Sequence, residues 1–267
     1  MGSWAKSLFN KENFSNVGII VAGTNSPEFE QKILSYFERV IFSKDSVYHA
    51  HLALLKGKEY PIVFNVYGAP ALVDVLTEMH DGGCRNVVLV GYAYGGFKNL
   101  EIGEIVLPSM SYHFDGIYHA LKLDKKAEVP DKDLRNILKE LLDKYVEGVN
   151  ISVPAVTFQL PHIEYKELDP ITVEMETAAC FSRSKEIGIR SAAILVISDN
   201  KKDSINDDRK KEIRRSAKEK VLKLVIENLE QFDLPDLGVE FKIDEYLANV
   251  IADPDDTTNV YKKNNAK

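Results

Sequence analysis

Cysteine is scarce in this chain of 267 residues: Cys84 and Cys180 are the only two, and both lie in apolar stretches. So few cysteines exclude a disulfide framework, and we expect two buried free thiols in a protein of a reducing compartment. No apolar run reaches the ~20 residues that a membrane-spanning helix needs. The first residues also lack the apolar core of a signal peptide. We therefore expect a cytoplasmic protein that does not interact with membranes.

Positive charge is also in short supply. Lys and Arg number 34 against 41 Asp and Glu, which gives a net charge of −7 and a pI of about 5.5. This balance argues against a general nucleic-acid or anionic-membrane binder, although it allows a local basic patch. The histidine spacing matches no zinc motif. The Gly91-x-x-x-Gly95-Gly96 segment lacks the Lys of a P-loop and the third glycine of a dinucleotide fingerprint. The sequence therefore predicts neither a metal nor a resident cofactor.

Apolar, β-branched runs alternate with segments of helical periodicity along most of the chain. The expected strands are 17–22, 47–55, 62–66, 86–91, 102–110, 149–158 and 190–197. The expected helices are 27–40, 71–79, 131–146, 177–187 and 207–232. Because no linker or repeat interrupts this alternation, it predicts one α/β domain. We place that domain at 17–251, after an N-terminal extension (1–16) and before a polar, flexible tail (252–267).

Several local signals set the expected element ends. Ser26 is a good N-cap and Pro27 a good first helical residue. Gly82-Gly83 should end the helix expected at 71–79. The residues from Gly91 to Gly96 should form a flexible loop, and Pro108 should end the strand 102–110. Pro154 should make 149–158 an edge or bent strand. In the last helix, the expected buried stripe is Ile213, Val221, Leu224, Val225 and Leu229.

The chemically distinctive stretch is Val173-Glu174-Met175-Glu176, which opens an Ala-rich helix. Acidic residues in a first helical turn are favoured by the helix dipole, which is the plain explanation of both glutamates. However, the apolar strand 190–197 follows and ends in Ser198-Asp199. A carboxylate at that place points toward the edge of an α/β sheet where ligands bind.

A series of motifs resembles the purine nucleoside/uridine phosphorylase family over about residues 17–229. In chain order these are the Gly23 loop, Gly68-Ala69-Pro70, the Gly91 loop, Gly103-Glu104-Ile105, Phe158, Val173-Glu174-Met175-Glu176 and Ser198-Asp199. The resemblance implies a central mixed twisted sheet flanked by helices, in homo-oligomers that are dimers or trimers of dimers. It also implies glycosyl transfer in nucleoside metabolism, as in purine salvage: cleavage of the bond between a nucleoside's base and its ribose.

The resemblance assigns roles to individual residues. Glu176 accepts both protons of the ribose 2′,3′-diol, with Met175 under the sugar and Glu174 beside it. Asp199 donates a proton to purine N7 as the base leaves, which requires a raised pKa. The plain alternative for Asp199 is a cap on the following loop. Phe158 stacks on the base, or simply packs in the core. Uridine-type members grip uracil with a Gln and an Arg; His162 and Glu164 stand there, which favours a purine.

The phosphate site departs most from the family pattern. Three arginines and a loop hydroxyl bind phosphate in the family, and here the matching positions hold Pro27, Ser46, Leu89 and Ala93. Gly23 and Gly91 are kept, so backbone N–H donors persist. The family's N-terminal His, which serves a neighbouring subunit's sugar site, has no counterpart. His49 and His51 could substitute, although surface histidines are the expected reading.

Three hypotheses follow from these departures. The first is phosphorolysis with inorganic phosphate as co-substrate, held by Lys44, Arg85 or Lys98. The second is hydrolysis, with Glu28 activating water. The third is a non-catalytic nucleoside-binding or partner subunit. Arg209 opens the last helix, where the family often places an arginine that helps protonate the base, but here a surface charge is the expected role.

Overall fold

The computed structural model describes residues 4–24, 26–45, 47–96, 98–120, 126–155 and 167–242. Its strands are β1 (Val17–Ala22), β2 (Arg39–Asp45), β3 (His49–Leu55), β4 (Lys58–Val66), β5 (Asn86–Tyr94), β6 (Ile105–His113), β7 (Ala127–Glu128), β8 (Val146–Ser152), β9 (Thr172–Glu174) and β10 (Arg190–Asp199). Its helices are α1 (Trp4–Phe9), α2 (Pro27–Leu34), α3 (Gly68–Asp81), α4 (Ile117–Ala120), α5 (Lys132–Leu141), α7 (Thr177–Glu186), α8 (Asp208–Glu227) and the 3₁₀ turn η1 (Leu229–Phe232). Among these, no helix is both long and apolar enough to cross a membrane.

Strand β5 is the branch point of the sheet because it pairs with three neighbours. On one side it runs parallel to β1, which leads on to β4, β3 and the edge strand β2. On the other side it runs parallel to β10 and touches β9 through the pair Tyr94–Val173. Strands β6 and β8 connect β10 back to β9, so five strands close into a ring. A short open sheet therefore continues into a small barrel.

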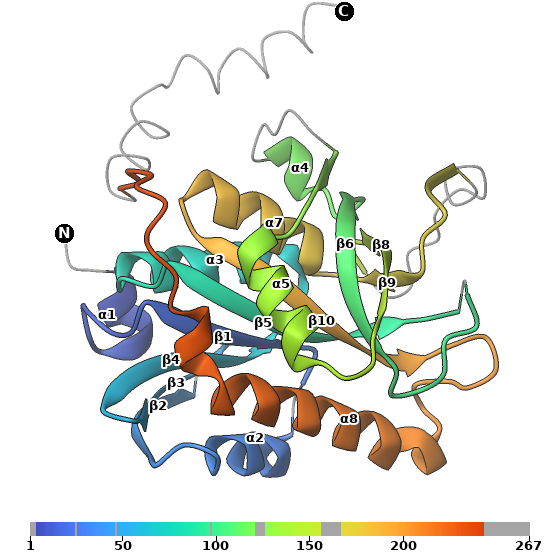
Figure 1. Ribbon diagram of the computed structural model, residues 1–267, viewed down its shortest axis with the longest axis horizontal. Helices are drawn as coiled ribbons and strands as arrows, with labels where there is room; N and C mark the ends of the chain where they lie inside the picture. Colours follow the sequence, from blue (N-terminus) through green and yellow to red (C-terminus); the bar gives the residue numbers. More distant parts are fainter. Residues whose placement is uncertain are drawn as a thin grey trace, which may run out of the picture.

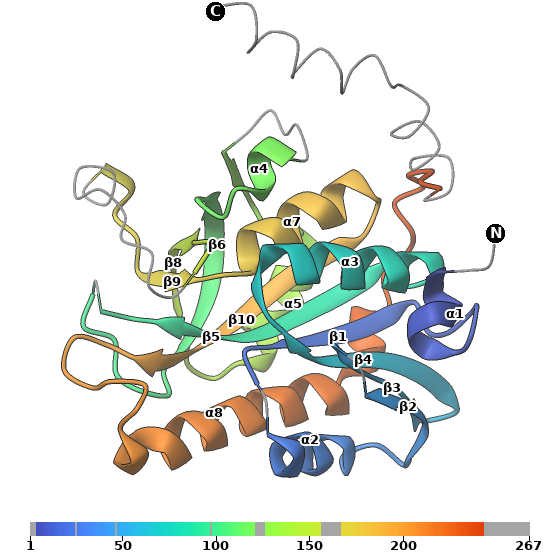
Figure 2. The same cartoon turned by 180° about the vertical axis from the view of Figure 1, so that it is seen from behind.

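Helices cover both faces of this sheet (Figures 1 and 2). Helices α2, α5 and α8 pack on one face, where buried Phe29, Leu138 and Val225 belong to one apolar cluster. Helices α1, α3 and α7 pack on the other face, in a second cluster. A third, smaller cluster includes Leu195 and Ile197 of β10. Cys84 and Cys180 are buried free thiols, as expected. The fold is thus the expected α/β domain with a mixed sheet flanked by helices.

The region after α2 differs from the expectation. Helix α2 ends at Leu34 rather than near Val40, and β2 begins at Arg39. The buried residues at 29, 33 and 37 suggested one long helix, but Phe37 lies in the turn after it. The run from Val40 to Phe42 pairs with β3 instead. Strand pairing has overridden the helical pattern here.

The strands that form the ring were also predicted imperfectly. Strand β5 continues to Tyr94, where a flexible loop was expected, because β10 pairs with it along its length. Pro108 lies inside β6, next to an irregularity in its pairing with β8. Strand β8 ends before Pro154, and it lies between β6 and β9 rather than at an edge. The predicted boundaries failed where partners come from distant parts of the chain.

The predicted helix 177–187 matches α7, but the predicted helices 131–146 and 207–232 differ from the structure. Helix α5 ends at Leu141, so the predicted end at 146 is incorrect. The last segment divides into α8 and η1. Val221 and Val225 are buried as expected, but Ile213 is 46% exposed and does not belong to the buried stripe.

Candidate active site

Three parallel strands bring four of the predicted site residues, Gly23, Gly91, Ala93 and Asp199, to one end of the sheet. Strands β1, β5 and β10 lie side by side in the order β1-β5-β10, so their carboxyl ends meet there. Gly23 follows β1 with φ of +63°, a backbone conformation that glycine adopts without strain. Gly91 and Ala93 lie opposite Leu195 and Ile197 in the β5–β10 pairing. Asp199 ends β10. This is the edge at which open α/β sheets bind ligands.

Glu174 is a buried carboxylate whose acceptor positions are all used by the protein. One oxygen accepts from the Ser152 hydroxyl and, at 2.7 Å, from the Asn150 amide. The other accepts from the backbone N–H groups of Glu176 (2.8 Å) and Thr177 (2.7 Å). Burial raises the pKa of Glu174, and these four donors oppose that rise. Because four donors match the capacity of an ionised carboxylate, Glu174 carries the negative charge of the pair and fixes the start of α7.

Glu176 stands at the N-cap position of α7 without a side-chain capping bond. Its Oε1 accepts from the backbone N–H of Gly68 at 2.6 Å. Burial and the neighbouring charge of Glu174 raise the pKa of Glu176. Gly68 has φ of +78°, and a β-carbon there would lie 3.7 Å from the Met175 Cε atom. The three residues of the predicted sugar site are therefore ordered around the start of α3. Neither glutamate lies within the first turn of α7, but Glu176 is its N-cap and Glu174 accepts from the N–H of its first residue, Thr177, so the plain explanation as residues that stabilise the helix start still applies to Glu174.

Asp199 faces a cation that sequence reasoning missed. Burial raises the pKa of Asp199, while the Ser198 hydroxyl, 2.5 Å from its Oδ1, and the charge of Arg214 oppose the rise. Arg214 lies on α8, and its guanidinium donates to the carbonyl of Ile205 at 2.6 Å. Arg209, the arginine considered from the sequence, instead pairs with Asp207 at 2.7 Å and is 87% exposed. Arg214, five residues after Arg209 on α8, is instead the cation whose charge acts on Asp199.

A cavity of about 410 Å³ opens beside the Gly23 loop. It is lined by the loop, the start of α2, Tyr92 and three cations of α8: Gly23, Thr24, Ser26, Pro27, Glu28, Phe29, Tyr92, Lys211, Arg214 and Arg215. The cations stand at i, i+3 and i+4, the spacing that places side chains on one helix face. Lys211 and Arg215 both lower the pKa of Glu28, after the larger effects of its backbone and Ser26 hydrogen bonds. The lining of this cavity thus carries three cations against one carboxylate.

Lys218 continues the same face of α8 one turn further and is fully buried. Its Nζ donates to the Ala22 carbonyl and, at 2.6 Å, to the Thr24 hydroxyl. The ammonium lies 4.1 Å from the centroid of the Tyr92 ring. Burial lowers the pKa of Lys218 to about 7, and the charge of Glu176 opposes this. Lys218 therefore fixes the residues on both sides of Gly23, although the sequence did not single it out.

The other basic residues considered for phosphate lie away from this cavity. Each is held by another partner: Lys44 by the Ser7 carbonyl, Arg85 by Asp236 and Lys98 by Asp169. His51 is only 3% exposed and His49 is half-buried, so the expectation of surface histidines is wrong for both. Four positions of the sequence argument lie outside the described residues: Ser46, Phe158, His162 and Glu164.

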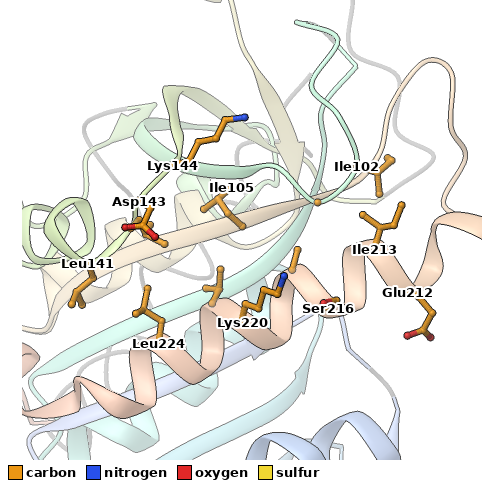
Figure 3. A pocket seen from close by; sticks show the side chains of 14 residues that line it. Ile102, Ile105, Leu141, Asp143, Lys144, Glu212, Ile213, Ser216, Lys220 and Leu224 are labelled. Atoms are coloured by element: carbon orange, nitrogen blue, oxygen red, sulfur yellow. The ribbon is translucent and has the colours of Figure 1, made fainter.

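A larger groove, of about 790 Å³, lies on the other side of α8. Figure 3 shows Ile213 and Leu224 of α8 facing it, with Ile105 and Leu141 across from them. The groove is mostly apolar, and none of the predicted site residues lines it. Chemistry therefore points to the smaller cavity at the sheet edge.

Comparison with models of protein families shows the family to which this chain belongs. The model of the phosphorylase superfamily matches residues 17–230, which is most of the chain. This chain belongs to the phosphorylase superfamily. It is a divergent member, because the positions that bind phosphate in the purine nucleoside/uridine phosphorylases hold no arginine.

Individual relatives agree with this membership. The DeoD-type purine nucleoside phosphorylases of two Clostridium perfringens strains, ATCC 13124 and SM101, are each 28% identical over 155 residues. The match covers 54% of this chain and 65% of theirs, so the chain spans slightly less than two thirds of these curated relatives.

Solved structures show the same fold at low identity. A 5′-methylthioadenosine/S-adenosyl homocysteine nucleosidase from Campylobacter jejuni has a TM-score of 0.68 at 15% identity, over 82% of this chain and 100% of its own. Purine nucleoside phosphorylase from Toxoplasma gondii, in complex with immucillin-H, has a TM-score of 0.70 at 14% identity, over 82% and 93%. Uridine phosphorylase from Vibrio fischeri has a TM-score of 0.67 at 19% identity, over 80% and 91%. These neighbours share an architecture but include both phosphorylases and a nucleosidase.

Proposed function

We propose that this protein cleaves the N-glycosidic bond of a purine nucleoside by phosphorolysis and releases the free base and ribose 1-phosphate. The observation that carries the choice of phosphate is the cavity beside Gly23. Lys211, Arg214 and Arg215 bring there the positive charge that a dianionic nucleophile needs. The basic face of α8 thus takes the place of the family's missing arginines.

The sugar end of the site would act through Glu176. As the bond to the base breaks, positive charge grows on the ribose ring, and a carboxylate bound to the 2′,3′-diol becomes more favourable. Glu174 supports this role indirectly, because its charge is fixed by four donors and it holds the start of α7. In the free protein the raised pKa of Glu176 favours its proton, so nucleoside binding should release a proton.

The base end of the site would act through Asp199. Its raised pKa suits a group that donates a proton to purine N7 as the base departs. Arg214, whose charge opposes that rise, would stabilise the carboxylate that remains after the transfer. The curated relatives are purine nucleoside phosphorylases, which supports a purine over a pyrimidine.

Hydrolysis is the second candidate, and one observation favours it. Glu28 lines the same cavity, and its backbone and Ser26 hydrogen bonds lower its pKa, so it is ionised at neutral pH. An ionised carboxylate at that place could accept a proton from an attacking water.

A phosphate-dependence assay separates the candidates. Purified protein is incubated with inosine, adenosine, guanosine and uridine, with and without phosphate, and the free base is quantified by chromatography. Phosphorolysis predicts base release only with phosphate. Release of base and free ribose regardless of phosphate, abolished in Glu28→Gln, would establish hydrolysis instead. No release, together with a nucleoside-induced rise in Tm, would mark a binding protein.

Charge-removing variants of α8 test the phosphate site itself. Lys211→Gln/Arg215→Gln should raise the KM for phosphate at least about 100-fold, because each of the two lost charge-assisted hydrogen bonds is worth about 1.5–3 kcal/mol. Lys220→Gln removes a charge from the same helix but lines the larger groove, so it should leave that KM unchanged. An equal effect of both variants would contradict a site-specific role.

A further inference from the structure

A second polar cluster lies between α2 and the β2–β3 hairpin. The Glu30 carboxylate, on α2, receives one histidine on each oxygen. His49 Nδ1 is 2.8 Å from Oε2, and His51 Nε2 is 2.8 Å from Oε1. Glu30 is only 12% exposed at its side chain, and His51 is 3% exposed. Two histidines of β3 therefore converge on one carboxylate of α2.

The hairpin adds a second carboxylate by cross-strand pairing. Asp45 of β2 lies opposite His49 of β3, and Ser43 lies opposite His51. Residues two apart on a strand share a face, so both pairs point to the same side, where α2 packs. Ser43 Oγ is 2.8 Å from His51 Nδ1. This hydrogen bond fixes the orientation of the His51 ring, whose other nitrogen contacts Glu30.

One donor atom each from Glu30, Asp45 and His49 lies within 4.8 Å of the other two. Tetrahedral zinc bonds of ~2.0–2.2 Å require ligand atoms about 3.3 Å apart, which small side-chain rotations reach from this starting point. Within the part of the chain that the structure describes, this is the one such group of three metal-ligating side chains. An imidazole with two carboxylates is a donor set that suits zinc.

We propose that Glu30, Asp45 and His49 bind a Zn²⁺ ion at the junction of α2 and the β2–β3 hairpin. On binding, neutral His49 coordinates through Nδ1 and carries its proton on Nε2, and one metal bond to His49 and one to Glu30 replace the hydrogen bond between them. His51 does not bind the ion. It donates to the other oxygen of Glu30 and orients that ligand, as groups behind metal ligands commonly do. Histidine spacing alone did not predict this site, because two of its three ligands lie outside the His-x-His sequence.

The site has a structural consequence that is independent of nucleoside cleavage. Helix α2 begins at the wall of the cavity beside Gly23, and an ion would tie that helix to the hairpin. We expect the metal to stabilise the folded protein by binding to it and not to the unfolded chain.

The test uses the full-length protein after removal of metal with EDTA. Zn²⁺ is titrated by calorimetry, and Co²⁺ is titrated while its visible absorption is recorded, because the bands report ligand type and coordination number. We expect one ion per chain, a Co²⁺ spectrum of a site with nitrogen and oxygen ligands, and a rise in Tm with Zn²⁺.

Variants decide which residues are ligands. Asp45→Asn and His49→Gln should weaken Zn²⁺ binding at least about 100-fold, and His51→Gln about 10- to 100-fold, as for groups that orient a ligand. His119→Gln, an exposed histidine of α4, is the matched control and should bind as the parent does. Absence of stoichiometric binding, or binding that survives both Asp45→Asn and His49→Gln, would overturn the proposal. Among the described residues, the side-chain hydrogen bonds of His49 and His51 go to Glu30 and Ser43 and not to the Asp45 carboxylate, so Asp45→Asn keeps the test valid if His49→Gln is unstable.

Discussion

Glu174 and Glu176 are two residues apart but have different electrostatic environments. Four donors hold the Glu174 carboxylate, whereas the Glu176 carboxylate accepts from the backbone N–H of Gly68. Burial and the charge of Glu174 raise the pKa of Glu176. The four donors therefore place the buried negative charge on Glu174, whereas the raised pKa of Glu176 favours its protonated form.

The raised pKa of Glu176 predicts a pH-dependent stability. The folded-state pKa of Glu176 is about 8, against an ordinary value of 4.5. Between these two pH values, the folded protein therefore binds more protons than the unfolded chain. Stability should therefore fall as pH rises through that window, with a slope of up to about 1.4 kcal/mol per pH unit. Glu176→Gln should remove this slope, so its Tm advantage over the parent grows from pH 5 to pH 8. Parallel Tm curves for the two proteins would contradict the shift; Glu212→Gln, on α8, is the control.

At the scale of elements, a capped helix start could be predicted, but the start of α3 was expected at 71 and lies at Gly68, and several helix ends were also misplaced. Ser26 and Pro27 predicted the start of α2, and both take the expected places: Ser26 caps the Phe29 N–H and Pro27 opens the helix. Such capping is local and can be read from four residues. The end of α2 depends on β2 pairing with β3, which no local pattern reveals.

The same contrast applies to the candidate site. Glu176 and Asp199 were found by resemblance, since they retain the family's residue types. The sequence did not reveal the role of Lys211, Arg214 and Arg215. Charged residues occur on several faces of α8, and only the fold shows which face lies beside Gly23. Lys218 was missed because a lysine in a charged helix gives no sign that it is buried.

Loss of the α2 cap should affect both stability and phosphate binding. Ser26→Ala removes the oxygen that accepts from Phe29 N–H and should cost about 1 kcal/mol of unfolding free energy. Because α2 begins at the cavity wall, the KM for phosphate should rise as well. Urea unfolding measures the first effect, with an unchanged m-value. Ser35→Ala, at the other end of α2, should leave the phosphate KM unaltered, and an equal rise in both variants would refute the role of the helix start.

At the scale of the whole molecule, one edge of the sheet carries apolar surface. Strand β2 pairs only with β3 among the described strands, and it exposes 37% of Val40 and 43% of Ile41. Exposed apolar edge strands favour pairing with another chain. Together with the homo-oligomer that the family resemblance implies, this makes β2 the surface where we propose that two copies meet.

A charge at that edge tests the assembly. Light scattering after gel filtration should give a mass that is a multiple of 30.1 kDa for the parent. Ile41→Lys should lower it, because pairing would bury the new charge. Val129→Lys introduces the same change at another exposed valine and should keep the parent mass. A monomeric parent at micromolar concentration would exclude the homo-oligomer.

The closed ring of β5, β10, β6, β8 and β9 also determines when the site can first exist. Strand β10 must reach β5, about a hundred residues earlier in the chain, before the ring closes. Such distant pairings form late, because the chain loses much freedom before it gains contacts. During synthesis, strands β1 to β5 can pair first, while the backbone groups of β5 that will pair with β9 and β10 remain unpaired. Binding competence should therefore arise abruptly near the end of translation, and a nascent chain paused before residue 190 should rely on chaperones to cover β5.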